Sequence, residues 1–245
     1  MLIVYEDNEI IIVEKPGGMP VHPSKLHQGD TLADMVREHL KLSEDEFTFR
    51  CLTRLDKDTS GLVLIAKTLE AAQNLNRQMA EKKILREYEA VVEDDGSLPD
   101  EGIIEAPVAR ASEDVHDIRR CVRDDGEYAM TRYAVIERSP GTARARCILE
   151  TGRTHQIRAH FAHLGHPLIG DGLYGPPRNE DCLIARQALH AYKISITQPW
   201  KNNEVLTLTA PPPADLQSLI EKFLPRTDLN RMLKINTEEP HDKQD

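Results

Sequence analysis

The chain of 245 residues has only four cysteines, no long hydrophobic run and fewer basic than acidic side chains. No apolar stretch approaches the roughly 20 residues that a membrane-spanning helix needs. The first residues also lack the basic and then apolar order of a secretory signal peptide. We therefore expect a cytoplasmic protein that binds no membrane.

The four cysteines, Cys51, Cys121, Cys147 and Cys182, lie far apart and form no CxxC pair. Such pairs are typical of zinc sites and redox motifs, and cytoplasmic proteins keep their thiols reduced. We expect four free thiols and no zinc held by cysteine. The phosphate-binding loop of nucleotide triphosphatases and the Gly-x-Ser-x-Gly elbow of serine hydrolases are also missing, so no nucleotide cofactor is expected.

Positive charge is scarce, because 31 basic residues face 41 acidic ones and the formal net charge is −10. At face value this argues against a nucleic-acid partner, since such partners are held by clustered Lys and Arg. The distribution is uneven, however. Residues 151–200 alone hold more basic than acidic side chains, 5 against 3, together with five of the ten histidines. We expect an anionic partner to contact this segment, weakly and less well as salt rises.

The pattern of apolar residues predicts an α+β protein in which strands dominate. The expected strands cover residues 2–5, 9–14, 47–52, 61–67, 85–92, 130–137, 143–149, 191–197 and 204–209. The expected helices cover residues 30–42, 68–82, 154–164 and 214–224, with Asp30 and Thr154 as N-caps. We predict one domain over residues 1–235, a mostly antiparallel mixed sheet with flanking helices and loops around a central cleft, and a disordered polar tail over 236–245.

A first candidate site is the loop Arg54-Leu-Asp-Lys-Asp-Thr-Ser-Gly61 between two predicted strands. Asp, Ser and Gly are ordinary turn residues, so a structural role is open. A carboxylate at a strand end can also act as nucleophile or general base. Asp56, two residues after Arg54 and near Thr59, is the candidate for that role.

A second candidate site is the segment 151–167, where His155 and Arg158 share one stripe of the predicted helix. A basic helix start can hold a phosphate or pair with a buried carboxylate. Its four histidines, at positions 155, 160, 163 and 166, could instead be solvated, satisfied in the core, or metal ligands. Their spacings of five, three and three match neither HExxH nor a zinc finger, so the metal interpretation is weak. A third cluster, Arg86-Glu-Tyr88, could simply pack in a strand.

Taken in order, these clusters resemble the RluA-type pseudouridine synthases. The resemblance runs from Val4 to about Pro211. Its strongest pieces are the Arg54–Gly61 loop, Arg86-Glu-Tyr88, residues 126–133, Thr151-Gly-Arg-Thr-His-Gln-Ile-Arg158 and its continuation to Gly175.

The resemblance implies isomerisation of uridine in RNA to pseudouridine, without a cofactor or a metal. Asp56 matches the essential aspartate, Arg158 the basic residue that pairs with it, and Tyr88 the tyrosine that stacks on the target base. Arg54 matches the arginine that enters the RNA helix where a base has flipped out. The further expected RNA contacts are Thr59, Arg153, His155 and Gln156. The implied partner is structured RNA, ribosomal or transfer, and a monomer is the simple expectation.

Two departures from the family pattern qualify this interpretation. Thr53 stands where the family commonly has histidine before Arg54, and the first predicted strand begins at Leu2, where many members first carry a small RNA-binding domain. Two other functions remain open: an inactive RNA-binding or RNA-folding protein of the same fold, and a metal hydrolase that uses the histidines. Which RNA and which uridine is modified is not encoded in any recognisable motif.

Overall fold

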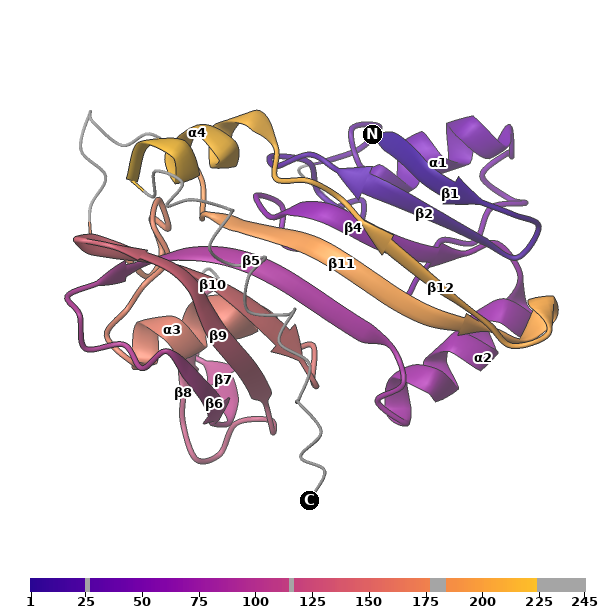
Figure 1. The fold of residues 1–245 in the computed structure, drawn as a ribbon. Coiled ribbons are helices and arrows are strands. Elements are labelled where there is room, and N and C mark those ends of the chain that lie inside the picture. Colours follow the sequence, from indigo (N-terminus) through magenta and orange to yellow (C-terminus); the bar gives the residue numbers. More distant parts are fainter. Residues whose placement is uncertain (25–26, 115–116, 177–183, 224–245) are drawn as a thin grey trace, which may run out of the picture.

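The computed structural model describes residues 1–24, 27–114, 117–176 and 184–223 (Figure 1). Its main feature is one sheet of ten strands, whose path runs β1-β2-β4-β11-β5-β10-β9-β6, with β12 beside β11 and β3 beside β4. The strands are β1 Leu2–Glu6, β2 Ile10–Lys15, β3 Arg50–Cys51, β4 Ser60–Ala66, β5 Leu85–Asp94, β6 Glu101–Glu105, β9 Met130–Ser139, β10 Gly141–Leu149, β11 Leu189–Gln198 and β12 Glu204–Thr209.

A small hairpin of β7 Val108–Arg110 and β8 Arg120–Val122 forms a second sheet. The helices are α1 Leu32–Leu40, α2 Leu69–Ala80, α3 Gln156–His163 and α4 Ala214–Phe223, and a 3-10 turn covers Pro199–Lys201. Figure 1 shows α3 beside this hairpin, with α4 over the opposite side of the sheet. The predicted α+β class, the single domain and the mixed sheet are therefore confirmed. The predicted boundary at 235 and the tail over 236–245 lie outside the described residues.

The strand that follows the Asp56 loop is β4, an interior strand of the sheet in which all seven residues are buried. It pairs with β2 in antiparallel and with β11 in parallel orientation. The backbones of β4 and β11 approach closely at Gly61, where an added Cβ would lie 2.4 Å from the carbonyl oxygen of Ala191. Glycine at this position, with φ 116°, therefore allows the loop that carries Asp56 to continue into β4 beside β11.

Three local predictions are wrong. The cap of α1 is Thr31, whose hydroxyl accepts from Asp34 N while the Asp34 carboxylate accepts from Thr31 N, a reciprocal capping box that Asp30 does not offer. The cap of α3 is His155, not Thr154. The strand predicted over 47–52 shrinks to β3, because only Arg50 and Cys51 pair with β4.

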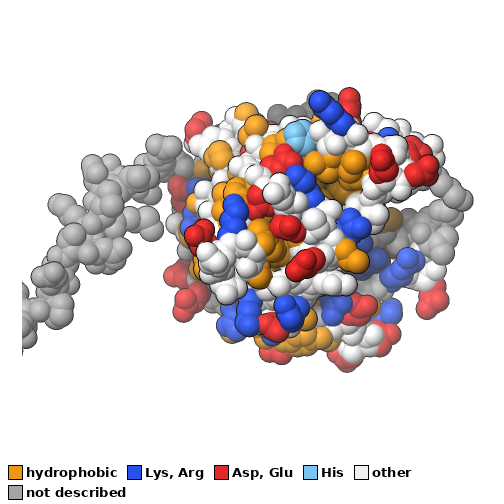
Figure 2. Space-filling model, turned by 90° about the vertical axis from the view of Figure 1, so that its right-hand side faces the viewer, with side chains coloured by type: hydrophobic (Ala, Val, Ile, Leu, Met, Phe, Trp, Pro, Cys, Tyr) orange, Lys and Arg blue, Asp and Glu red, His pale blue; other side chains and the backbone are white. Residues whose placement is uncertain are grey.

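The surface carries charges of both signs (Figure 2), and three cysteines are free thiols. Among the described residues, no helix is long and apolar enough to cross a membrane. On the face shown in Figure 2, acidic and basic side chains are interspersed without a broad area of one sign. Cys51, Cys121 and Cys147 are free thiols, and Cys182 lies outside the described residues. Burial raises the pKa of Cys51 to about 12, so this thiol is unreactive at neutral pH.

Candidate active site

The loop from β3 to β4 holds Asp56 in a fixed place. Thr59 N donates to the Asp56 carbonyl oxygen at 3.1 Å, and Leu64 N donates to the Thr53 hydroxyl at 2.9 Å. The Thr53 side chain is buried, and its bond with Leu64 N holds the start of the loop against β4. This contact is the role that threonine takes here in place of the expected histidine.

A buried lysine anchors the same loop to the end of β2. The Lys15 ammonium donates to the carbonyl oxygens of Pro16, Met19 and Lys57 at 2.8 to 2.9 Å. Burial lowers the pKa of Lys15 to about 7, against the opposite effect of Asp58. Sequence reasoning missed Lys15, because a lysine at a strand end is usually solvated.

The Asp56 carboxylate faces Arg158 on α3. Arg158 Nη1 donates to Asp56 Oδ2 at 2.8 Å, while Nε and Nη2 donate to the two carboxylate oxygens of Asp171 at 2.7 and 2.9 Å. Burial opposes the charge of Arg158, but the bonds with Asp171 and Asp56 outweigh it and raise its pKa. The buried Asp171 therefore fixes the guanidinium, and the guanidinium in turn orients Asp56. Among the described residues, Asp56 Oδ1 has no hydrogen-bond partner.

His155 approaches the same carboxylate from the start of α3, with Nε2 at 3.7 Å from Asp56 Oδ2. Its Nδ1 lies 2.9 Å from the hydroxyl of Tyr174, which also accepts from Arg120 N at 2.7 Å. The tyrosine has one hydroxyl proton, and Nδ1 is the acceptor within reach among the described residues. Tyr174 therefore favours the neutral His155 tautomer with its proton on Nε2, facing Asp56.

The backbone of His155 supports a functional role. Its φ of 57° lies in the left-handed region, and its side chain makes no capping bond. This conformation costs about 1 kcal/mol or more for a residue other than glycine. It directs the imidazole toward Asp56 instead of the helix end.

We predict that Tyr174→Phe slows turnover about tenfold at pH 8 with little change in KM, because the imidazole can then turn the lone pair of Nε2 toward Asp56. Burial lowers the pKa of His155 below its ordinary value, so the deficit should narrow at the acid end of the pH range, where protonation restores an N–H at Nε2. The groups facing His155 are Asp56, Arg158, Asp171 and Arg120. Rates measured from pH 5.5 to 8.5 test this, with Tyr192→Phe as the control; a deficit independent of pH contradicts it.

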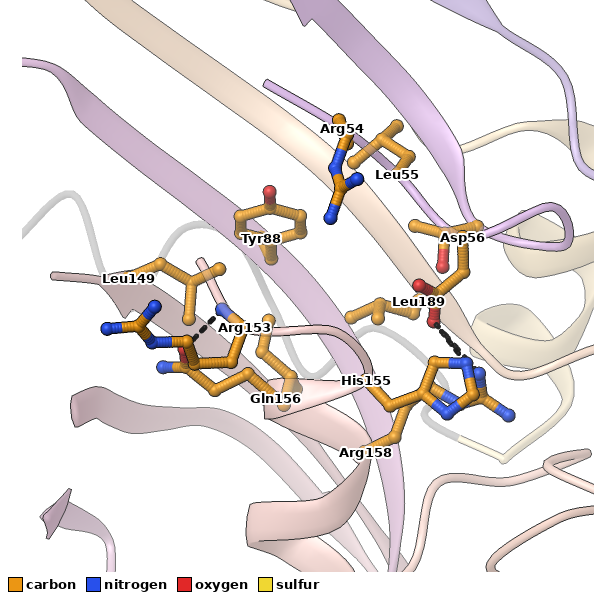
Figure 3. A pocket seen from close by; sticks show the side chains of 12 residues that line it. Arg54, Leu55, Asp56, Tyr88, Leu149, Arg153, His155, Gln156, Arg158 and Leu189 are labelled. Carbon is orange, nitrogen blue, oxygen red and sulfur yellow. Dashed lines mark hydrogen bonds and ion pairs between the residues drawn. The ribbon is translucent and has the colours of Figure 1, made fainter. Parts of the chain in front are cut away.

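The pocket beside Asp56 brings all eight predicted site residues together (Figure 3). It is lined by Arg54, Leu55, Asp56, Thr59, Tyr88, Leu149, Arg153, His155, Gln156, Ile157, Arg158 and Leu189. This inner pocket holds only about 50 Å³ and adjoins a groove of about 540 Å³ that shares Arg54, Asp56, Tyr88 and Arg153 with it. A nucleotide therefore has to occupy both.

Tyr88 and Arg54 differ in exposure within the pocket. Tyr88 is 6% exposed, and burial raises its pKa. Arg54 is exposed and lines the groove as well as the inner pocket. In Figure 3 the two side chains lie near each other, away from the contact between Arg158 and Asp56. An aromatic ring and an exposed cation at this end suit a flat, hydrogen-bonding ligand.

The other expected RNA contacts behave differently. Gln156 is 2% exposed, and its amide is used within the protein, with Thr151, Arg153 N, Met130 O and Thr131. Thr59 is also buried and accepts from Gln187. Gln156 therefore has a structural position, whereas Arg153 is exposed at the rim of the groove and donates to Tyr128 O.

The basic lining of the groove comes from more of the chain than residues 151–200. A neighbouring hollow is lined by Arg54, Arg110, Arg120 and Arg153, together with Asp125 and Glu127. Arg110 and Arg120 belong to the β7–β8 hairpin. Basic side chains from outside residues 151–200 therefore line these hollows too, and the contact of an anion with residues 151–200 stays a prediction.

Comparison with known proteins identifies the family of the chain. A family model described as RNA pseudouridylate synthase matches residues 9–163. The chain is 37% identical over 239 residues to ribosomal large subunit pseudouridine synthase D of Nitrosomonas europaea, covering 94% of the chain and 68% of that protein. The chain belongs to the RNA pseudouridylate synthase family. This confirms the predicted family and its activity, isomerisation of uridine in RNA.

Further relatives of the RNA pseudouridylate synthase family give the same result. Ribosomal large subunit pseudouridine synthase D of Neisseria meningitidis serogroup B is 38% identical to the chain over 252 residues, which cover 98% of the chain and 66% of that protein. The chain thus spans about two thirds of the length of these relatives. The solved structure of human RNA pseudouridylate synthase domain containing 1 has a TM-score of 0.73 at 24% identity and covers 98% of the chain and 96% of its own. That likeness confirms the fold.

Ring nitrogens of three of the four histidines, His155, His160 and His166, are engaged within the protein. Both ring nitrogens of His160 are engaged, with Thr131 and with Ala106 O, each at 2.9 Å. Over the described part of the chain, the one group with ligand atoms close enough for a metal is Asp94, Asp95 and His166, in which Asp94 pairs with Arg138. Of the four histidines only His166 belongs to this group, so the described residues do not bring the four together as metal ligands.

Sequence reasoning missed Asp171 and Tyr174. Both lie in the stretch that continues the Thr151–Arg158 segment to Gly175. The available signal was an acidic residue and a tyrosine between glycines, following the helix that carries Arg158. Its meaning depends on how that loop folds back, which the spacing does not reveal.

Proposed function

We propose that this protein flips a uridine out of structured RNA and isomerises it to pseudouridine with Asp56 as the essential carboxylate. The observation that carries the proposal is the contact of Asp56 Oδ2 with Arg158 at 2.8 Å, which leaves Oδ1 toward a pocket lined by Tyr88 and Arg54. A base inside a duplex is out of reach, so the nucleotide must leave the stack first.

The reaction exchanges one bond of uracil for another. The bond between N1 and the ribose C1′ breaks, a bond between C5 and C1′ forms, C5 loses a proton and N1 gains one. Atoms and electrons balance without an oxidant or a cofactor. Oδ1 of Asp56 is placed either to attack covalently or to take a ribose proton; both routes need an oriented carboxylate, which Arg158 and Asp171 supply.

Two further side chains act on the RNA, one on the flipped base and one in the gap that it leaves. Tyr88 stacks on the flipped uracil, and Arg54 fills the gap left in the RNA, where a planar guanidinium can stack and donate hydrogen bonds. The names of the relatives favour ribosomal large subunit RNA as the substrate over transfer RNA. The enzyme acts as a monomer in the cytoplasm, where its three described free thiols remain reduced.

The proposal is tested on RNA from a strain in which the gene is deleted. Purified protein is added, and pseudouridine is mapped chemically on ribosomal and transfer RNA. Restoration of a discrete set of sites is expected, with ribosomal sites first. If no site is restored, the proposal is wrong, and RNA binding without modification would favour the inactive RNA-binding alternative.

For Arg54→Ala we expect turnover on a structured RNA hairpin to fall about tenfold, because nothing then stabilises the unstacked helix. On an unpaired oligonucleotide the loss should be small, since no gap has to be filled. Single-turnover rates on the two RNAs measure this, with Arg77→Ala, an exposed arginine of α2 that does not line the groove, as the control. Equal losses on both RNAs contradict the gap-filling role.

A further inference from the structure

Arg86, two residues before Tyr88 on β5, is a buried cation without an acidic partner. It is 8% exposed. Its Nη2 donates to Leu149 O at 3.2 Å, and its Nε has no partner. Within the described residues, no carboxylate oxygen lies within 4.0 Å of its guanidinium.

The other buried basic side chains of the described chain are all better compensated. Lys15 donates to three carbonyl oxygens, Arg158 to two carboxylates, and Arg186 to the carboxylate of Asp215. Burial lowers the pKa of Arg86, and only Tyr88 opposes this effect. Since an uncompensated buried charge is costly, Arg86 attracts an anion from outside the protein.

The guanidinium stands at the wall of the groove. Arg86 lines the groove together with Arg54, Arg153 and Gly152, but it does not line the inner pocket. A Cβ at position 152 would lie 2.8 Å from Arg86 Nη1. Glycine at that position therefore leaves room for the guanidinium beside the groove.

We propose that Arg86 binds a phosphodiester group of the substrate RNA, next to the flipped uridine. The inference rests on the proposed function for the identity of the RNA, and on Arg86 itself for the anion. The inner pocket with Asp56 takes the base, so the chain on either side of it runs through the groove. A phosphate supplies the missing negative charge and can accept two N–H bonds from one guanidinium. A uracil carbonyl would supply no charge.

The salt dependence of RNA binding tests the contact. The titrations use a fluorescein-labelled RNA hairpin whose loop contains uridines, and all proteins carry Asp56→Asn so that no RNA is modified. The variants are Arg86→Met and Arg86→Lys. The control is Arg77→Met, which changes an exposed arginine of α2. Loss of one phosphate contact makes the negative slope of log K against log salt shallower by about 0.7 to 0.9. We expect that loss for Arg86→Met alone, because lysine keeps the charge. An unchanged slope for Arg86→Met overturns the proposal.

A second measurement uses no RNA. Inorganic phosphate should raise the Tm of the wild type more than chloride at equal ionic strength, and Arg86→Met should lose this difference. Loss of the phosphate effect with an unchanged RNA slope means that the site takes free phosphate, which overturns the RNA assignment. If the wild type binds no RNA, the proposed function fails, while the phosphate titration still decides the anion site. Should Arg86→Met fail to fold, Arg86→Gln replaces it, since its amide can still donate to Leu149 O.

Discussion

Asparagine at position 56 should lower the rate of pseudouridine formation about 10⁴-fold or more, the scale seen when an essential nucleophile or base is removed. The amide neither attacks carbon nor takes a proton, so both possible routes are lost together. Folding should be almost unaffected. The Asp56 side chain is 23% exposed, and its partner Arg158 keeps both bonds to Asp171.

The measurement is the single-turnover rate on an RNA that the wild type modifies, together with the affinity for that RNA. Affinity should stay within about twofold, because the groove is intact. Asp58→Asn is the matched control, since it makes the same change two residues away in the same loop. Activity of Asp56→Asn above a tenth of the wild-type rate would show that another group does the chemistry.

Lysine at position 158 should lower both activity and stability. One planar guanidinium donates to Asp56 and to both oxygens of Asp171, whereas an ammonium on a flexible stem cannot hold the three bonds together. The Asp171 side chain is fully buried, so weaker pairing there is expensive. We expect the free energy of unfolding to fall by about 2 kcal/mol and the rate about 100-fold.

Urea denaturation and single-turnover rates measure these two effects separately. Arg132→Lys is the control, because Arg132 pairs with Glu150 at the surface and should change stability by less than about 0.5 kcal/mol. A variant Arg158→Lys that retains the wild-type rate would mean that the orientation of Asp56 does not depend on the guanidinium.

Local patterns predicted much of the fold. The apolar run before Lys67 reads as a buried strand, and β4 is one. The position of β11 between β4 and β5 could not be predicted, since it joins strands far apart in the sequence. Polar neighbours such as Asp30 and Thr31 are equally good caps by composition, so only the reciprocal bond with Asp34 distinguishes them.

In the candidate site, too, local patterns were predictable and contacts between distant segments were not. Arg158 and His155 were expected on one helix stripe, but their shared target, Asp56, is about a hundred residues away and was placed opposite them only by the family resemblance. Glutamine is usually a surface residue, yet Gln156 is buried and its amide bonds to other groups of the protein. Asp171 and Tyr174 become meaningful only when the loop after α3 returns to Arg158 and His155.

Release of the uracil C5 hydrogen tests the central claim most directly, because the new bond to ribose replaces that hydrogen. RNA carrying tritium at C5 of uracil is incubated with the wild type and with Asp56→Asn. We predict that the wild type releases tritium to water in an amount equal to the pseudouridine formed, and that the variant releases none. No release from any ribosomal or transfer RNA, or equal release by both proteins, would contradict the account.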